Sequence, residues 1–172
     1  MLREPHARPC TPVDAADLPI MERLWQLFRH DLSEFTELLP NPDGTFGGNR
    51  LHTAFTDADR APHLLMSDNS PVGFVVVRGL LPPRRVLNAF FVVRGARRKG
   101  IGLQAVRDVT TKYPGRWEVA FQDTNVNAAR FWRRVAADIA GEAWTEEHRP
   151  VPNRPDLPPD AWISFSIPTQ PA

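Results

Sequence analysis

Val86-Leu87-Asn88-Ala89-Phe90-Phe91-Val92-Val93-Arg94-Gly95-Ala96-Arg97-Arg98-Lys99-Gly100-Ile101-Gly102 is the stretch of sequence that decides the fold. It begins as an apolar run typical of a buried strand and continues as a basic, glycine-rich loop. Apolar residues at helical spacing follow, so the loop ends at a helix N-terminus. Free backbone N–H groups, the helix dipole and the basic side chains would all favour an anion there. We therefore predict a phosphate site in the loop.

The composition is that of one ordinary globular domain covering residues 1–172, with 42% hydrophobic residues and a net charge of +1. Such a charge argues against binding to nucleic acid or a membrane surface by the whole molecule. No apolar run reaches the roughly 18 residues of a membrane span. Cys10 is the single cysteine, so no intrachain disulfide can form and we expect a reducing, cytoplasmic location. His52 and His63 show no metal-ligand spacing, and we predict no metal site.

Outward from this stretch, apolar periodicity and turn residues predict the other elements. Residues 1–10 are expected to form a short edge strand or a loose arm, and residues 150–160 a proline-rich loop. Helices are predicted at 18–35, 50–57, 101–112 and 126–137, and strands at 63–67, 72–77, 86–93, 116–121, 143–149 and 162–167. A strand–helix–strand crossover makes strands 86–93 and 116–121 parallel. The prediction is an α/β (α+β) domain with a mixed, mostly antiparallel sheet of six to seven strands and helices on both faces.

Two motifs stand at strand-to-helix junctions. Arg97-Arg98-Lys99-Gly100-Ile101-Gly102 matches Arg/Gln-x-x-Gly-x-Gly/Ala, and Asn125-Val126-Asn127-Ala128-Ala129-Arg130-Phe131-Trp132 matches Asn-x-x-Ala-x-x-Phe-aromatic. Together, in this order, they resemble the GCN5-related N-acetyltransferase (GNAT) superfamily. The flanking residues are similar to a bacterial branch of predicted acetyltransferases without a settled substrate. The resemblance extends over nearly the whole chain.

The resemblance implies a V-shaped splay between the fourth and fifth strands that holds acetyl-CoA. It implies that the loop binds the pyrophosphate, that the strand edge pairs with the pantetheine arm, and that the N–H of Val92 polarises the thioester carbonyl. The implied cofactor-binding residues are Val92, Val93, Arg94, Arg97, Arg98, Lys99, Gly100, Ile101, Gly102, Asn125, Ala128 and Phe131. Asp31, Phe35 and Phe90 are predicted to contact the acceptor substrate.

The chain departs from the family pattern at both acid–base positions. Ala89 stands where many members have a general-base Glu, and Trp132 where many have a Tyr that protonates the leaving thiolate. An indole N–H can donate a hydrogen bond but supplies no proton near neutral pH. Three hypotheses remain: catalysis by positioning and carbonyl polarisation alone, a substitute carboxylate, or loss of acetyl transfer. Glu118 is the first substitute candidate, ahead of Asp31, Glu34 and Asp123, and a structural ion pair is its alternative role. The catalytic candidates are Val92, Glu118, Trp132 and Asn88.

The functional prediction is an acyl-CoA-dependent N-acyltransferase. Acetyl-CoA is the expected donor and a primary amine of a small molecule the expected acceptor, with direct attack in a ternary complex. One alternative is an aminoacyl-tRNA or carrier-protein donor, to which Arg84, Arg85 and Arg107 would offer charge. Another is a non-catalytic CoA-binding or interaction module. Apart from a tRNA donor we predict no nucleic-acid partner and no membrane partner. A homodimer is possible, because dimers are frequent in this superfamily.

Overall fold

The computed structural model describes residues 10–81 and 83–169. Within these ranges one mixed sheet has the strand order β1-β2-β3-β4-β5-β7-β6. Its strands are β1 (Thr11–Pro12), β2 (Arg60–Ser67), β3 (Ser70–Arg78), β4 (Arg84–Val92), β5 (Gly115–Phe121), β6 (Trp144–Arg149) and β7 (Asp160–Ile167). The helices are α1 (Leu18–Thr36), α2 (Asn49–Thr56), α3 (Ile101–Lys112) and α4 (Val126–Ala140), with short 3₁₀ turns η1 (Ala15–Asp17) and η2 (Arg94–Ala96).

The predicted architecture is confirmed. Among the described strands, β4 and β5 form the parallel pair, and the other pairs are antiparallel. Helix α4 runs to Ala140, past the predicted end, and stops where Gly141 takes a positive φ of 60°. Strand β1 pairs with β2 as an edge strand. The arm expected at residues 1–10 lies outside the described residues except for Cys10.

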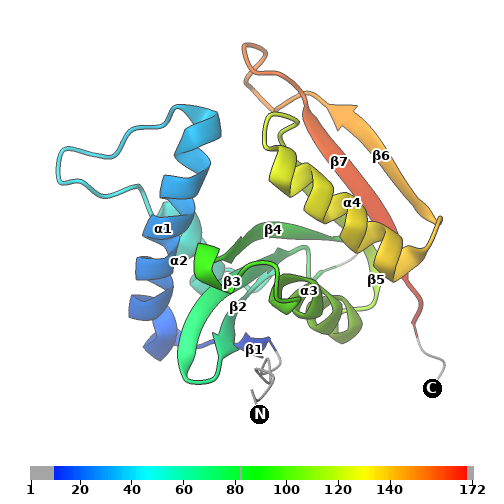
Figure 1. The fold of residues 1–172 in the computed structure, drawn as a ribbon, viewed down its shortest axis with the longest axis horizontal. Coiled ribbons are helices and arrows are strands. Elements are labelled where there is room, and N and C mark those ends of the chain that lie inside the picture. Colours follow the sequence, from blue (N-terminus) through cyan, green and yellow to red (C-terminus); the bar gives the residue numbers. More distant parts are fainter. Residues whose placement is uncertain (1–9, 82, 170–172) are drawn as a thin grey trace.

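Helices cover both faces of the sheet and enclose two apolar cores. One core lies under α3 and α4 and includes Val106, Trp117 and Ile163, all of which are fully buried. The other lies under α1 and α2 and contains Met21 and Phe74. Figure 1 shows α1 and α2 beside the β2–β4 half and α4 across β7 in the other half. Each amphipathic helix thus turns its apolar stripe onto one face of the sheet.

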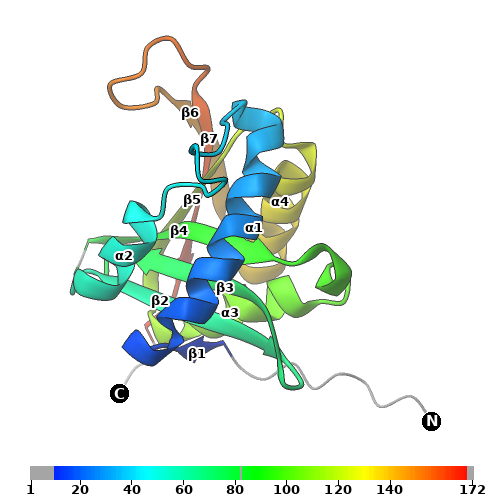
Figure 2. The ribbon, with the colours of Figure 1, turned by 90° about the vertical axis from the view of Figure 1, so that its left-hand side faces the viewer.

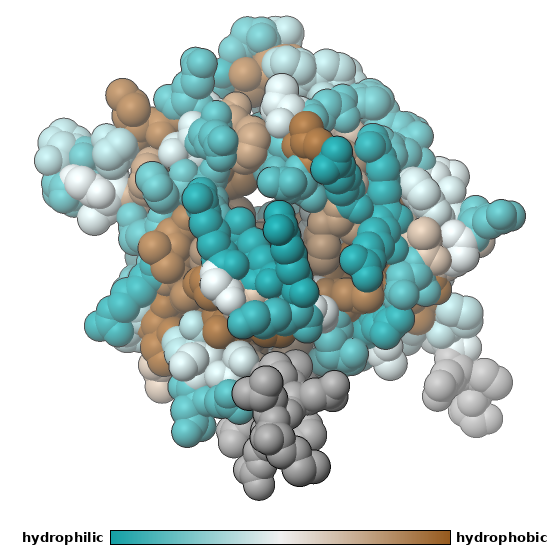
Figure 3. Space-filling view, viewed as in Figure 1, coloured by the Kyte–Doolittle hydropathy of each residue, from teal (hydrophilic) through white to brown (hydrophobic). Residues whose placement is uncertain are grey.

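The two halves of the sheet separate beyond a short common segment. Parallel pairing between β4 and β5 covers residues 84–86 with residues 116–118 and then ends. Figure 2 shows β5 and β7 running steeply away from β4. The surface is correspondingly hollowed between the half with α1 and the half with α4, with hydrophilic residues around the opening (Figure 3). This is the predicted V-shaped splay.

None of the helices in the described ranges is long and apolar enough to cross a membrane.

Candidate active site

The loop after β4 offers unpaired backbone donors at the start of α3. Gly100 is the N-cap and has a φ of 77°, a left-handed conformation that favours glycine. The first α-helical hydrogen bond runs from the N–H of Gln104 to the carbonyl of Gly100, at 3.0 Å. The preceding N–H groups at this helix end therefore have no helical acceptor, as at any helix start. Arg98 and Lys99 are exposed beside them. The loop thus has the unpaired N–H groups and the exposed cations on which the predicted phosphate site depends.

Gly102 is small for a reason that the sequence did not indicate. A Cβ added at Gly102 would lie 3.2 Å from the rings of both Phe90 and Phe131. Those rings stack with centroids 5.2 Å apart, and Phe90 also meets Trp132 edge-on at 5.1 Å. Gly102 therefore lets α3 approach an aromatic cluster formed by Phe90, Phe131 and Trp132. This cluster packs with the core under α3 and α4, whereas α1, with Asp31 and Phe35, covers the opposite face.

The edge of β4 that faces the splay carries the peptide groups of Val92. The N–H of Val93 donates to the carbonyl of Val72 at 2.8 Å and is thus used within the sheet. Because successive residues in a strand direct their peptide groups to opposite edges, the N–H and C=O of Val92 point toward the splay. Val93 therefore contributes no free N–H there. The carbonyl of Val92 accepts a hydrogen bond of 2.7 Å from Nε of Arg97.

Asp31 joins helix α1 to the basic loop. Its carboxylate accepts hydrogen bonds from Arg94, at 2.9 and 3.1 Å, and pairs with Arg97. Burial alone would raise the pKa of Asp31, but these two guanidinium groups outweigh it and lower the pKa. The structure thus brings Asp31 together with Arg94, Arg97 and the edge of Val92. The ring of Phe35 on α1 is half-buried and meets no other aromatic ring or cation in the described residues.

Asn88 is the extra residue of a β-bulge. The register between β3 and β4 shifts so that Val76 pairs with Ala89 while Val77 pairs with Leu87. Asn88 is left without a partner residue on β3, and the two flanking residues point to opposite faces of the sheet. The bulge bends β4 at the point where it leaves β5.

Asn125 caps α4, and Trp132 is part of the core. The side-chain oxygen of Asn125 accepts a hydrogen bond of 3.1 Å from the N–H of Ala128, which uses that N–H in the cap. Trp132 is only 6% exposed. Asn125 and Trp132 therefore both stabilise the fold beside the splay, independently of any ligand.

Glu118 is buried inside a cluster of arginines. It is 1% exposed and accepts hydrogen bonds from Arg149 at 3.1 and 3.2 Å, from Arg84 at 3.4 Å and from Arg116 at 3.4 Å. Burial alone would raise the pKa of Glu118, but the bonds and charges of Arg149, Arg84 and Arg116 lower it. The carboxylate joins three strands at the closed end of the splay. The ion-pair role considered from the sequence is therefore present in the structure.

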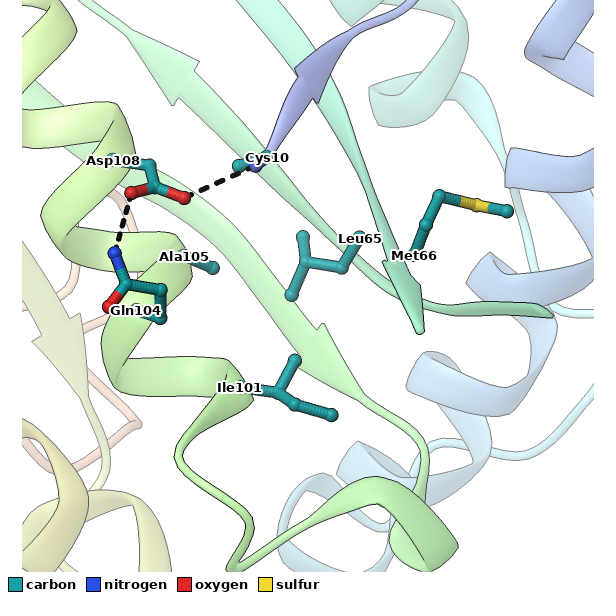
Figure 4. Close-up of a pocket in the computed structure, with 7 residues that line it drawn as sticks. All are labelled: Cys10, Leu65, Met66, Ile101, Gln104, Ala105 and Asp108. Atoms are coloured by element: carbon teal, nitrogen blue, oxygen red, sulfur yellow. Dashed lines mark hydrogen bonds between the residues drawn. The ribbon is translucent and has the colours of Figure 1, made fainter. Parts of the chain in front are cut away.

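Cys10 lies in a small pocket between β2 and α3, away from the splay between β4 and β5 (Figure 4). Its backbone N–H donates to Asp108, which also accepts a hydrogen bond of 2.8 Å from Gln104. Burial, assisted by the charge of Asp108, raises the pKa of the Cys10 thiol to about 12. A thiol that stays protonated is a poor nucleophile. Within the described residues no group of three or more His, Cys, Asp or Glu could hold a metal ion.

Comparisons with known proteins agree with this geometry. The family model described as Acetyltransferase (GNAT) family matches residues 21–136. No match was found among curated proteins.

Solved structures similar to this chain include an acetyltransferase from Thermus thermophilus, with a TM-score of 0.66 and 18% identity over 92% of this chain and 96% of that one. The ribosomal L7/L12 α-N-protein acetyltransferase in complex with coenzyme A has a TM-score of 0.63 and 14% identity, covering 92% and 93%. Aminoglycoside 6′-acetyltransferase type Ii has a TM-score of 0.66 and 14% identity, covering 95% and 100%. At these identities the likeness is one of fold. With the family match over most of the chain, it shows that this protein belongs to the GNAT family of acetyltransferases.

Proposed function

We propose that this protein transfers an acetyl group from acetyl-CoA to the primary amine of a small molecule. The observation that carries the proposal is the N–H of Val92, which points toward the splay, on the strand that leads into the loop with the unpaired N–H groups at the start of α3. An anion-binding helix end and an unpaired strand edge in one groove suit a ligand with phosphates at one end and an extended amide chain at the other.

Bound acetyl-CoA supplies the activated acyl group, and the chain supplies binding and polarisation. The N–H groups before Gln104 and the side chains of Arg98 and Lys99 would hold the phosphates. The N–H of Val92 would stabilise negative charge on the carbonyl oxygen as the amine attacks, an effect worth about 3 kcal/mol for one well-placed donor. Direct attack fits the protonated state of Cys10, because no other cysteine could form an acyl-enzyme.

A polyanionic donor such as a charged tRNA is less well supported. Arg107 pairs with Asp138, and Arg84 pairs with Glu118. Two of the three arginines that suggested such a donor thus have carboxylate partners, whereas Arg85 has no ion pair within the described residues. Pairing of Arg84 and Arg107 within the protein reduces the charge available to a polyanion.

Titration calorimetry with coenzyme A and acetyl-CoA tests the binding site. Arg98→Glu replaces a loop cation with an anion. We expect it to weaken CoA binding by about tenfold or more, because an attraction to a phosphate becomes a repulsion. Arg23→Glu is the matched control, because Arg23 is exposed on α1 far along the helix from Asp31, and it should leave the affinity unchanged. Equal affinities for both variants would refute the assignment of the loop.

Release of CoA from acetyl-CoA, followed with a thiol reagent, then tests transfer. The acceptor panel contains methylamine, spermidine, an aminoglycoside and a peptide with a free N-terminus. Amine-dependent CoA release supports the proposal. Tight CoA binding with no release on any amine would favour the non-catalytic CoA-binding module.

A further inference from the structure

The second half of the sheet has a polar face on the side away from α4. Trp117, Val119, Phe121, Ala161, Ile163 and Phe165 point into the core under α4. Because side chains alternate along a strand, the residues between them point to the opposite face. This polar face carries Glu118, Ala120, Glu147, Arg149, Asp160 and Trp162.

Most charges on the polar face are already paired. Arg149 bonds Glu118, pairs with Glu147 and lies over the ring of Trp162, at 4.8 Å from its centroid. Asp160 is different, because its side chain has no hydrogen bond or ion pair with any residue in the described part of the chain. Asp160 is half-buried, and burial raises its pKa. A desolvated carboxylate without a partner costs free energy, which makes it a candidate for binding a cation.

The register places Asp160 where the splay is open. Phe121 pairs with Ala161, so Asp160 lies one position beyond the end of β5, whereas β4 and β5 part near Glu118. On the polar face Ala120 pairs with Trp162 and is the diagonal neighbour of Asp160, at roughly 7 Å by ordinary sheet geometry. Because the side chain of Ala120 is small, no large side chain at this position of β5 blocks the path to Asp160. A cationic group lying over Ala120 can therefore reach Asp160 from the splay.

We propose that Asp160 binds the amine of the acceptor and takes its proton. This inference rests on the proposed function. The ammonium nitrogen gives a proton to the carboxylate of Asp160, directly or through water. Its lone pair then forms the C–N bond with the acyl carbon while the C–S bond breaks. The second proton on nitrogen passes to solvent, and the CoA thiolate leaves with the electron pair and is protonated by solvent. The depressed pKa of Glu118 and its arginine partners leave that carboxylate unsuited to this task.

The variant Asp160→Asn tests the assignment. Its control is Glu142→Gln, the same acid-to-amide change at an exposed residue just after α4 that has no side-chain partner in the described residues. With the best amine of the panel, Asp160→Asn should lower kcat/KM by about 100-fold, the scale of a lost general base. It should also weaken binding of that amine to the CoA-saturated protein at least fivefold. CoA affinity and the far-UV circular dichroism spectrum should not change. Asp160→Glu should restore part of the rate.

The pH profile of kcat/KM gives a second readout. In the wild type the acidic limb should report a carboxylate above the ordinary Asp range, and Asp160→Asn should remove this limb. The charged groups on the face of Asp160 are Arg149, which pairs with Asp160 in the register of β6 and β7, Glu147, which pairs with Trp162, and Glu118, which pairs with Ser164, and all remain in the variant. Unchanged kcat/KM, amine affinity and pH profile in a folded Asp160→Asn protein would overturn the inference. A wild type that binds CoA yet acetylates no amine would instead contradict the proposed function.

Discussion

His63 should make the stability of this protein depend on pH between 6.5 and about 4. The side chain lies on β2 and is fully buried, with Nδ1 donating to the carbonyl of Ala61 at 3.1 Å. Its Nε2 is buried without a hydrogen-bond partner in the described residues, and the ring packs edge-on against Tyr113. Burial, opposed by the Ala61 bond and assisted by the charge of Lys112, lowers the pKa of His63 from 6.5 to about 4.

Proton linkage gives the direction in which the free energy of unfolding changes with pH. The unfolded chain binds a proton at His63 once the pH falls below 6.5, whereas the folded chain binds it only near pH 4. The contribution of neutral His63 is therefore complete above pH 6.5 and is lost as the pH falls toward 4. Between about pH 7 and about pH 5 this single group should lower the free energy of unfolding by about 2 kcal/mol.

Urea unfolding followed by tryptophan fluorescence at several pH values measures this effect. His63→Leu removes the titrating group and should flatten the dependence in this window, whatever its own stability. His30→Leu, at an exposed position of α1, should keep the wild-type slope. If the wild type and His63→Leu lose equal stability between about pH 7 and about pH 5, the buried-histidine argument is wrong.

Three further substitutions have expected outcomes. Glu118→Gln should lower the free energy of unfolding by about 2 kcal/mol, because it removes the buried counter-charge that three partly exposed arginines share; the rate per folded molecule and its pH profile should persist, and loss of either would restore Glu118 as a candidate base. Asp31→Asn should tighten CoA binding roughly threefold in calorimetry, because it removes a competing carboxylate from Arg97; weaker binding would show that Asp31 instead positions Arg97. Gly102→Ala should cost about 1–2 kcal/mol in urea unfolding, because the new methyl group meets two phenylalanine rings; an unchanged midpoint would mean that the rings move aside freely.

The sequence was sufficient for the fold because its signals are local. The apolar run of β4, the glycine at the left-handed N-cap of α3 and the spacing of the second motif each act over a few residues. They predicted the strand–loop–helix unit and the parallel pair, the family resemblance implied the splay, and the structure confirms all three. The observed ends of the elements differ from the predicted ends by a few residues. Helix α4, for example, continues past the last residue of its apolar pattern and ends at Gly141.

The contacts that decide the roles of the site residues join distant segments, and no local pattern indicates them. The partners of Glu118 come from β4, β5 and β6, and Asp31 on α1 meets the loop more than sixty residues later. Asp160 follows a proline-rich stretch, so the sequence analysis placed it in a loop and did not consider it. Only the sheet register shows that it lies one position beyond the end of β5, on the same face as Glu118.

The hydrogen bonds of Arg97 connect the two sides of the candidate active site. One guanidinium group reaches both the carbonyl of Val92, on the edge proposed to bind the donor, and Asp31 on α1, which is predicted to contact the acceptor. A ligand that pairs with the edge of Val92 must displace this arginine or accommodate it, and either outcome changes the environment of Asp31. By thermodynamic reciprocity, an acceptor that alters Asp31 must then change the affinity for the donor by the same factor. A single side chain would thus couple the binding of the two proposed substrates.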